Sequence, residues 1–432
     1  MAPAGVRRAM SPTPAGRSVP SRPPPPQPAL QISGFGYGHG QGMGQWGAYG
    51  YASEYGWGYR QLLAHYYGGT TLVTLASPEP DIAVRLVEAG GQRLRASSTG
   101  PGGLVASWAG GRPVAAGAVE VERTRGVQVI SVSSTCSGPW RKVATVPDAV
   151  TIAGARPGAS PPAPAGIAAS EVQACIPRLG RRTYQGELVS QPGGETDNIV
   201  GLEDYVEGVV AAEDPLSWAS SGGEAALEAQ AVAARSYALA VLAAAGPGSL
   251  CDDTACQMYL GLPSQYGPTA DAAASATAGR VLVCAAGSTC GPAGTVALTQ
   301  YSASTGGWSA GGLFPAVPDL GDSVAANPLH SWTKTVPVAR AESELPSIGK
   351  LREVEVTKRN GLGQLGGRVE QVEVVGSAGT VSLSGQQFAA DFSLRSDWFR
   401  IGAELHGPAA AAPATAGPPA TSLPAAVALP TA

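Results

Sequence analysis

Charged residues are scarce in this chain of 432 residues: Asp, Glu, Lys and Arg together make up 14%, and the formal net charge is −4. No basic stripe is present that could neutralise phosphates, so the sequence argues against a nucleic-acid binder. The chain also lacks any run of about 20 apolar residues, the length that crosses a bilayer. Residues 1–30 contain no apolar segment of the kind found in a secretory signal, only a proline-rich run.

Hydrophobic residues make up 44% of the chain, which is enough for a core, while 59 Gly and 37 Pro indicate many loops and turns. The length allows one large domain or two to three of ordinary size. The six cysteines are an even number in a chain rich in Pro, Ser and Thr, which favours disulfides formed in an oxidising compartment. Their spacing gives two local pairs, Cys251 with Cys256 and Cys284 with Cys290, and leaves Cys136 with Cys175.

The most informative stretch runs from Gly201 to Leu242. An apolar segment, Tyr205 to Val210, is predicted to be a strand that leads to the acidic pair Glu213 and Asp214. A helix rich in alanine is predicted from Glu224 to about Leu242. Helical spacing places Gln230 and Tyr237 on one face of this helix, and Arg235 lies beside them. Such an arrangement is typical of active sites, although a polar loop before a buried helix would give the same pattern.

The run YVEGVVAAEDPLSW, followed by EAALEAQAVAARSYAL, resembles the stage II sporulation protein D family, which also contains the amidase enhancer LytB. The resemblance covers most of residues 31–74 and 184–402. It places the catalytic glutamate of the family on Glu213. The chain departs from the family pattern at Asp214, where the family usually has Met, and at Glu228, where it usually has Lys.

The segment GFGYGHGQGMGQWGA, within Ile32 to Leu72 of this chain, resembles a second signature of the family. In the family this signature usually closes the domain, whereas here it opens it, so the order is expected to be circularly permuted. Further segments that resemble family motifs are CDDTACQMYLG, YSASTGGW and NPLHSWT. Some relatives are thought to bind zinc near the position of Cys251 and Cys256. We favour a disulfide there, because no His lies nearby in this sequence.

The resemblance implies lytic transglycosylation of peptidoglycan, without a cofactor or a metal. The β-1,4 bond between N-acetylmuramic acid and N-acetylglucosamine is broken, and a 1,6-anhydro sugar forms on glycan stripped of its stem peptides. One carboxyl group can serve as acid and then as base, whereas hydrolysing glycosidases normally use two. We interpret Asp214 as a turn or cap residue, because neighbours on an extended chain point to opposite sides.

A second function from another class remains open, since amidase enhancers of the family share these motifs. Such a protein would bind the wall and stimulate an N-acetylmuramoyl-L-alanine amidase without chemistry of its own. The expected partners are therefore peptidoglycan glycan strands and a cell-wall amidase, with no nucleic acid. We expect a secreted, wall-associated protein whose signal lies upstream of this start or has been removed.

For Glu213 to act as an acid, burial beside aromatic residues is expected to raise its pKa. Arg235 is expected to face a structural carboxylate or the sugar, or to form a helix salt bridge. The candidate substrate-binding residues are Gln230, Arg235, Tyr237, Tyr301, Ser302, Ser304, His39, Gln45 and Trp46. Structural alternatives are a tight turn after Tyr301, a His39 ring that holds the glycine loop together, and packing by Trp46.

The predicted fold is α+β: a strand-rich single catalytic domain with a few helices, plus an inserted or appended small β region. The expected parts are a disordered segment at 1–30, the N-terminal signature at 31–74, a β-rich region at 75–183, the catalytic core at 184–402 and a disordered tail at 403–432. Helices are predicted at 49–66 and 388–399, with a short one within 272–283. Strands are predicted at 82–87, 92–96, 119–121, 127–132, 183–190, 354–357, 369–375 and 380–383, and a flexible loop at 157–164.

Overall fold

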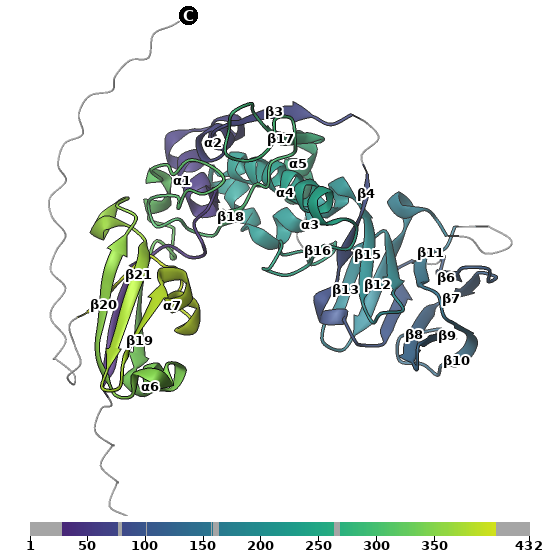
Figure 1. Ribbon diagram of the computed structural model, residues 1–432. Coiled ribbons are helices and arrows are strands. Elements are labelled where there is room, and N and C mark those ends of the chain that lie inside the picture. The colour runs from purple at the N-terminus through teal and green to yellow at the C-terminus, as the bar shows by residue number, and fades with distance from the viewer. Residues whose placement is uncertain are drawn as a thin grey trace, which may run out of the picture.

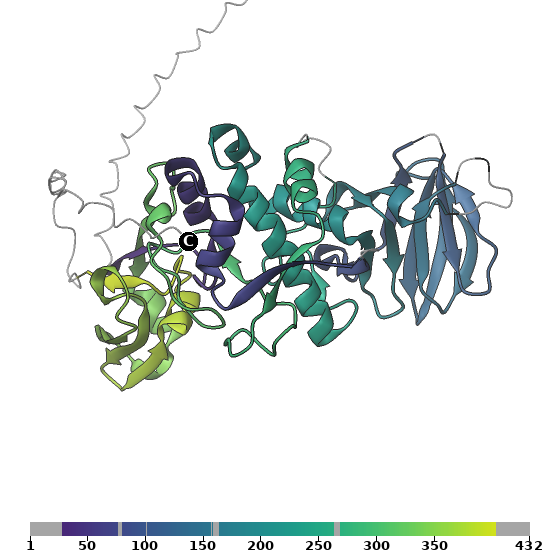
Figure 2. The same cartoon turned by 90° about the horizontal axis from the view of Figure 1, so that it is seen from above.

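The computed structural model describes residues 28–76, 80–100, 102–156, 158, 164–262 and 268–402. The expected tail at 403–432 and most of the expected flexible loop at 157–164 lie outside these residues. So does most of the segment at 1–30, but its end was predicted wrongly, because strand β1 already begins at Ala29. The described chain is α+β, as predicted, and forms three parts in a row: a β lobe, a helical centre and a C-terminal lobe (Figures 1 and 2).

The β lobe consists of two sheets, and all strand pairs are antiparallel except that of β16 with β4. Many of its strands alternate buried and more exposed residues, as in β12, because one face packs on the core between the sheets. One sheet has the strands β4 (Asp81–Arg85), β6 (Leu104–Trp108), β7 (Val114–Ala116), β11 (Val150–Gly154), β14 (Glu187–Ser190), β15 (Thr196–Gly201) and β16 (Leu250–Cys251). The other has β5 (Leu94–Ser98), β8 (Ala118–Thr124), β9 (Val127–Ser133), β10 (Arg141–Val146), β12 (Glu171–Ile176) and β13 (Gly180–Gln185).

The strand predicted at 183–190 is two strands in different sheets. Between β13 and β14 lies Gly186, with φ of 82°. A Cβ at that position would lie 1.9 Å from the carbonyl oxygen of Ile199, so the residue must be a glycine. The chain therefore turns from one sheet into the other at this point.

The helical centre is organised around α4 (Glu224–Ala245), which is longer by one turn than predicted. Alanine occupies much of this helix, and its small side chains allow neighbouring helices to approach closely. Packed around it are α1 (Gln45–Tyr55), α2 (Tyr59–Tyr66), α3 (Leu202–Glu213) and α5 (Thr269–Ala276). A short pair of strands, β3 (Thr70–Thr74) and β17 (Arg280–Cys284), lies alongside (Figure 1).

The prediction of a strand at Tyr205 to Val210 was wrong, because this segment lies inside helix α3. Its apolar residues also fit a helical face, since Tyr205, Val206, Val209 and Val210 are all buried. The acidic residues Glu203 and Asp204 lie in its first turn, where the helix dipole favours negative charge. Packing on α4 and α5 outweighs the strand propensity of the valines.

The single helix predicted from Tyr49 to Tyr66 is two helices. Helix α1 ends at Gly56, which has the left-handed conformation typical of a helix C-terminus. Helix α2 then starts at Tyr59 in a new direction. Tyr51 and Trp57 stack across this break, with ring centroids 4.0 Å apart.

The C-terminal lobe has a hydrophobic core of its own. One sheet has the order β19-β1-β23 and the other β20-β21-β22, so β1 from the N-terminus is a central strand of this lobe. The elements are β1 (Ala29–Phe35), β19 (Ser331–Pro337), α6 (Val338–Glu344), β20 (Leu351–Arg359), β21 (Val369–Gly376), β22 (Thr380–Ser384), α7 (Gly385–Asp391) and β23 (Phe399–Ile401). The strands predicted at 354–357, 369–375 and 380–383 are confirmed within longer ones, whereas α7 starts and ends earlier than predicted.

The six cysteines form the three expected pairs: Cys136–Cys175, Cys251–Cys256 and Cys284–Cys290. Both thiols near the suggested zinc position are thus bonded to each other. None of the helices in the described ranges is long and apolar enough to cross a membrane.

Candidate active site

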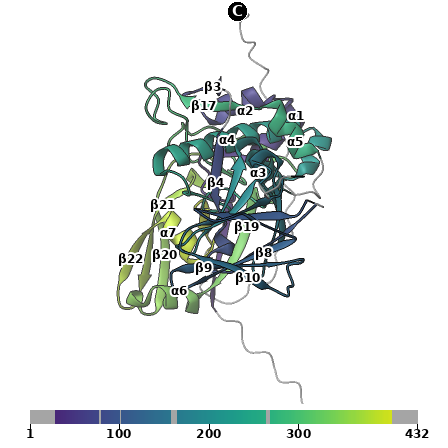
Figure 3. The same cartoon turned by 90° about the vertical axis from the view of Figure 1, so that its right-hand side faces the viewer.

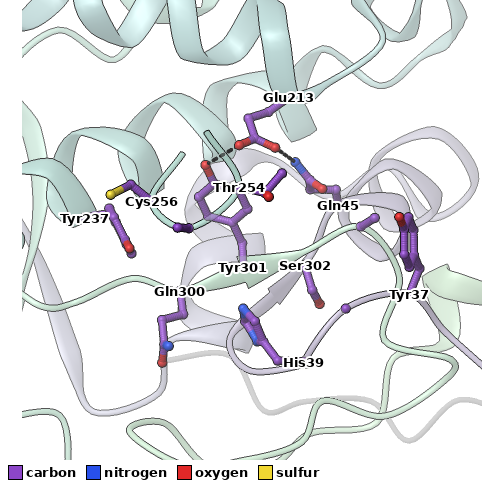
Figure 4. A pocket seen from close by; sticks show the side chains of 13 residues that line it. Tyr37, His39, Gln45, Glu213, Tyr237, Thr254, Cys256, Gln300, Tyr301 and Ser302 are labelled. Carbon is purple, nitrogen blue, oxygen red and sulfur yellow. Dashed lines mark hydrogen bonds between the residues drawn. The ribbon is translucent and has the colours of Figure 1, made fainter. Parts of the chain in front are cut away.

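A cavity of about 510 Å³ is lined by residues of α1, α3 and α4 and by the segments 37–39, 254–256 and 300–303. Its walls come from separate stretches of the chain, one of which supplies Glu213 (Figure 4). The lining residues are Tyr37, Gly38, His39, Gln45, Glu213, Tyr237, Thr254, Ala255, Cys256, Gln300, Tyr301, Ser302 and Ala303. In the described chain, one of these lining residues is a carboxylic acid.

Glu213 is the last residue of α3, and its carboxyl group is held in place by hydrogen bonds. Its Oε1 accepts from the backbone N–H of Met258 at 2.7 Å and is 3.2 Å from the hydroxyl of Tyr301. Its Oε2 faces Nε2 of Gln45 at 3.5 Å, which is long for a hydrogen bond. Because Oε1 is already occupied by the closer donors, a proton on this carboxyl group is best placed on Oε2.

The hydroxyl of Tyr301 lies between two acceptors. It is 2.9 Å from Oε1 of Gln257 and 3.2 Å from Oε1 of Glu213, and it has one proton to donate. Burial, and then the charge of Glu213, raises the pKa of Tyr301 well above its usual value, so the group stays a hydroxyl. Tyr301 can therefore donate to ionised Glu213, or donate to Gln257 when Glu213 is neutral.

The pKa of Glu213 is raised by burial, and the hydrogen bonds from Met258, Tyr301 and Gln45 oppose this in part. Its position at the C-terminus of α3 acts in the same direction as burial, since the helix dipole disfavours an anion there. The predicted direction of this shift is confirmed. A raised pKa keeps part of the population protonated nearer neutral pH, as a general acid requires.

Asp214 follows α3 in an extended conformation and is buried. Burial, and then the charge of Glu213, raises the pKa of Asp214 well above its usual range, which favours the neutral acid. It does not line the cavity, and within the described residues its Oδ1 has no hydrogen-bond partner. Asp214 therefore does not present a second carboxyl group to the cavity.

The glycine-rich N-terminal signature places Gln45 in the cavity. Strand β2 (Met43–Gly44) pairs in parallel with β18 (Tyr301–Ser302), so Gln45 and Tyr301 both lie beside Glu213. This pairing needs a glycine at position 42, where φ is 68° and a Cβ would lie 1.9 Å from the carbonyl oxygen of Gln300. The N-terminal signature thus packs against the cavity that contains Glu213.

The structure divides the predicted substrate-binding residues into two groups. His39, Gln45, Tyr237, Tyr301 and Ser302 line the cavity together with Glu213 (Figure 4). The others lie outside it: Gln230, Arg235, Ser304 and Trp46.

Two of the residues outside the cavity are held in ionic or polar networks. Arg235 is 0% exposed and makes a bidentate pair with Glu203, at 2.5 and 2.6 Å. The prediction that Arg235 contacts the sugar is therefore wrong, and the alternative of a structural carboxylate is correct. Ser304 donates to buried Asp322 at 2.7 Å. Asp322 also accepts from the backbone of Thr305 and Gly306, so this carboxylate fixes the turn after β18.

Gln230 and Trp46 do not line the cavity, and both polar atoms of the Gln230 amide lack a hydrogen-bond partner among the described residues. Gln230 is fully buried in α4. Trp46 packs edge-on against Tyr49 and Trp218, with ring centroids 5.6 and 4.9 Å away. The packing alternative for Trp46 thus describes its position better than a sugar contact does.

Several lining residues were not predicted from the sequence. Tyr37 lies in the glycine signature and is 48% exposed at the edge of the cavity. Thr254, Ala255 and Cys256 line the wall because the Cys251–Cys256 bridge closes their loop. Two features of the sequence could have identified them. Tyr37 is an aromatic residue between two glycines, and the short spacing of Cys251 and Cys256 indicates a closed loop.

Residues 192–284 match the family model of SpoIID, described as Stage II sporulation protein. This match contains α3, Glu213, α4 and the Cys251–Cys256 loop, and it agrees with the family resemblance of the sequence. Among curated proteins, no match to the chain was found. The family is linked to processing of cell-wall glycan.

Proposed function

Since the chain carries a SpoIID domain whose Glu213 lies in a cavity, we propose that it is a lytic transglycosylase of the cell wall. Its substrate is peptidoglycan glycan that has lost its stem peptides. The bond cleaved is the β-1,4 bond from N-acetylmuramic acid to N-acetylglucosamine. The observation that carries the proposal is the single, partly desolvated carboxyl group among the lining residues described.

In the proposed reaction Glu213 acts twice. Its Oε2 proton passes to the glycosidic oxygen, and the bond from C1 of the muramic acid to that oxygen breaks. The carboxylate then takes the proton from the C6 hydroxyl, whose oxygen bonds to C1 and closes the 1,6-anhydro ring. No water is consumed, so the second carboxyl group that a hydrolase needs is not required.

The polar residues near Glu213 suit both steps. Met258 holds Oε1 throughout, because a backbone N–H donates in either protonation state. The amide of Gln45 can donate to the carboxylate or, after turning over, accept from the acid. Tyr301 adapts in the same way through Gln257.

Mass spectrometry of denuded glycan after incubation with the protein tests the proposal. We expect products that end in 1,6-anhydro-N-acetylmuramic acid. Reducing ends formed by uptake of water would indicate a hydrolase instead. Absence of any new ends, together with stimulation of a cell-wall amidase, would favour the non-catalytic enhancer.

The pH dependence of the reaction gives a further prediction. Because the acid form of Glu213 starts the reaction, the rate should fall as the pH rises through its raised pKa. In Tyr301→Phe one donor to the carboxylate is lost, so the pKa of Glu213 should rise further and this fall should move to higher pH. Rates of anhydro-product formation across pH check this; an unmoved or downward-shifted profile would contradict it.

A further inference from the structure

A second hollow continues the Glu213 cavity toward the C-terminal lobe. It has a volume of about 420 Å³ and shares Gly38, His39 and Gln300 with the first. Its remaining walls come from α7 and the segment after it, including Gln386, Ser393 and Arg395. The two hollows therefore form one groove, whose far end is built by a part of the chain outside the SpoIID match.

The middle of this groove has features of a ligand site. Ser302 is 6% exposed, lines the first hollow, and its Oγ has no hydrogen-bond partner among the described residues. Its side chain lies near His39 in the cavity (Figure 4). Tyr37 offers an exposed ring at the same edge, which suits stacking against a sugar ring. A buried hydroxyl without a partner costs free energy unless a ligand satisfies it.

The charge at the far end of the groove is positive. Arg395 is exposed, and within the described residues it makes no ion pair. Asp397, which lines the same hollow, is already paired with buried Arg368. Lys334 adds positive charge behind Ser393, since its ammonium donates to the carbonyl oxygen of Ser393, whereas Arg340 is paired with Glu344.

Arg395 is also held in place. Its carbonyl oxygen accepts from the N–H of Gly38 at 2.8 Å, and its guanidinium lies 5.9 Å from the ring centre of Tyr37. The backbone of Arg395 is thus fixed beside the cavity wall that Tyr37 and Gly38 form, and its exposed guanidinium lies over the ring of Tyr37. Figure 3, viewed from the end of the molecule, shows α7 beside the strands β20, β21 and β22 of this lobe, below the helical centre.

We propose that Arg395 binds the free lactyl carboxylate of a muramic acid unit in the groove, and so selects glycan without stem peptides. This inference rests on the proposed function. Removal of the stem peptide turns the lactyl amide into a carboxylate, which is the group that distinguishes denuded from intact glycan. A guanidinium recognises a carboxylate through paired charge-assisted hydrogen bonds, which a neutral amide cannot match.

Binding to defined oligosaccharides tests this assignment. The full chain carrying Glu213→Gln, which prevents turnover, is titrated calorimetrically with denuded glycan oligomers and with chitooligosaccharides of equal length, which lack the lactyl group. Addition of Arg395→Gln should weaken binding of denuded glycan about tenfold, the loss typical of one charge-assisted hydrogen bond. Binding of chitooligosaccharide should not change.

Arg352→Gln is the matched control, because Arg352 is an exposed arginine of β20 in the same lobe that does not line the groove. It should change neither affinity. Equal weakening for both sugars, or none, would overturn the proposal. So would a loss of the same size for glycan that keeps its stem peptides, since Arg395 would then read a peptide carboxylate. Because binding is measured without turnover, failure of the proposed reaction would appear separately, in the product analysis of the active chain.

Discussion

Glu213→Gln is expected to reduce the rate of anhydro-product formation by about 10²–10⁴-fold, and toward the upper end of that range. The amide keeps the size of the side chain and can still accept from Met258, but it cannot donate and recover a proton. Both steps are lost together, because one group serves as acid and then as base. The rate is measured on denuded glycan, with binding of the same glycan as a second measurement that should change little.

Asp214→Asn is the matched control for this substitution. Asp214 is the adjacent residue, is buried and does not line the cavity, and burial raises its pKa, so an amide replaces its neutral form with little change in charge. Its rate should stay close to that of the wild type. Equal rates for wild type and Glu213→Gln would refute the assignment of the acid, and a larger loss in Asp214→Asn would move that role to Asp214.

Arg235→Met is expected to destabilise the protein by about 1.5–3 kcal/mol, because it removes the charge-assisted hydrogen bonds of a pair in which Arg235 is buried and Glu203 is 31% exposed. Arg235 is fully buried and donates to Glu203 through Nε and Nη2. It also donates to the carbonyl oxygen of Arg280 at 3.1 Å, which ties α4 to the start of β17. Unfolding by urea, followed by circular dichroism, measures the change in the free energy of unfolding.

Arg235→Lys separates a structural role from sugar binding. A lysine keeps the charge but not the planar fork, so it should recover only part of the lost stability. The glycan affinity of the folded fraction should stay near the wild-type value in both variants. Normal stability with lost glycan binding would instead restore the sequence-based prediction that Arg235 contacts the sugar.

The sequence predicted those parts of the site that depend on local motifs. Glu213, Gln45 and Tyr301 lie in three motifs far apart in the chain, and the structure brings Gln45 and Tyr301 to within 3.5 and 3.2 Å of the carboxyl group of Glu213. The cysteine pairs followed from their spacing, since short loops leave few alternatives. Motif matching succeeds here because each motif supplies its own side chain to a common cavity.

Other features depended on packing that a local pattern does not contain. The apolar segment of α3 fits a strand or a helix, and its packing on α4 decides between them. A polar residue on an alanine-rich helix can face a cavity, as Tyr237 does, or a buried partner, as Arg235 does. The groove end at Arg395 could not be predicted, because it requires the C-terminal lobe to lie against the N-terminal signature.

The position of β1 determines the order in which the molecule can be completed during synthesis. Ile32 pairs with Lys334 on one side and with Ile401 on the other, so a strand made near the beginning must wait for partners made near the end. The strands of the β lobe lie between residues 81 and 251 and can form their sheets much earlier. Two segments that line the Glu213 cavity lie between the paired strands β1 and β19 in the sequence. Residues 37–45 follow β1, and residues 300–303 precede β19. In a nascent chain, Glu213 is therefore made well before the segments that complete the groove around it.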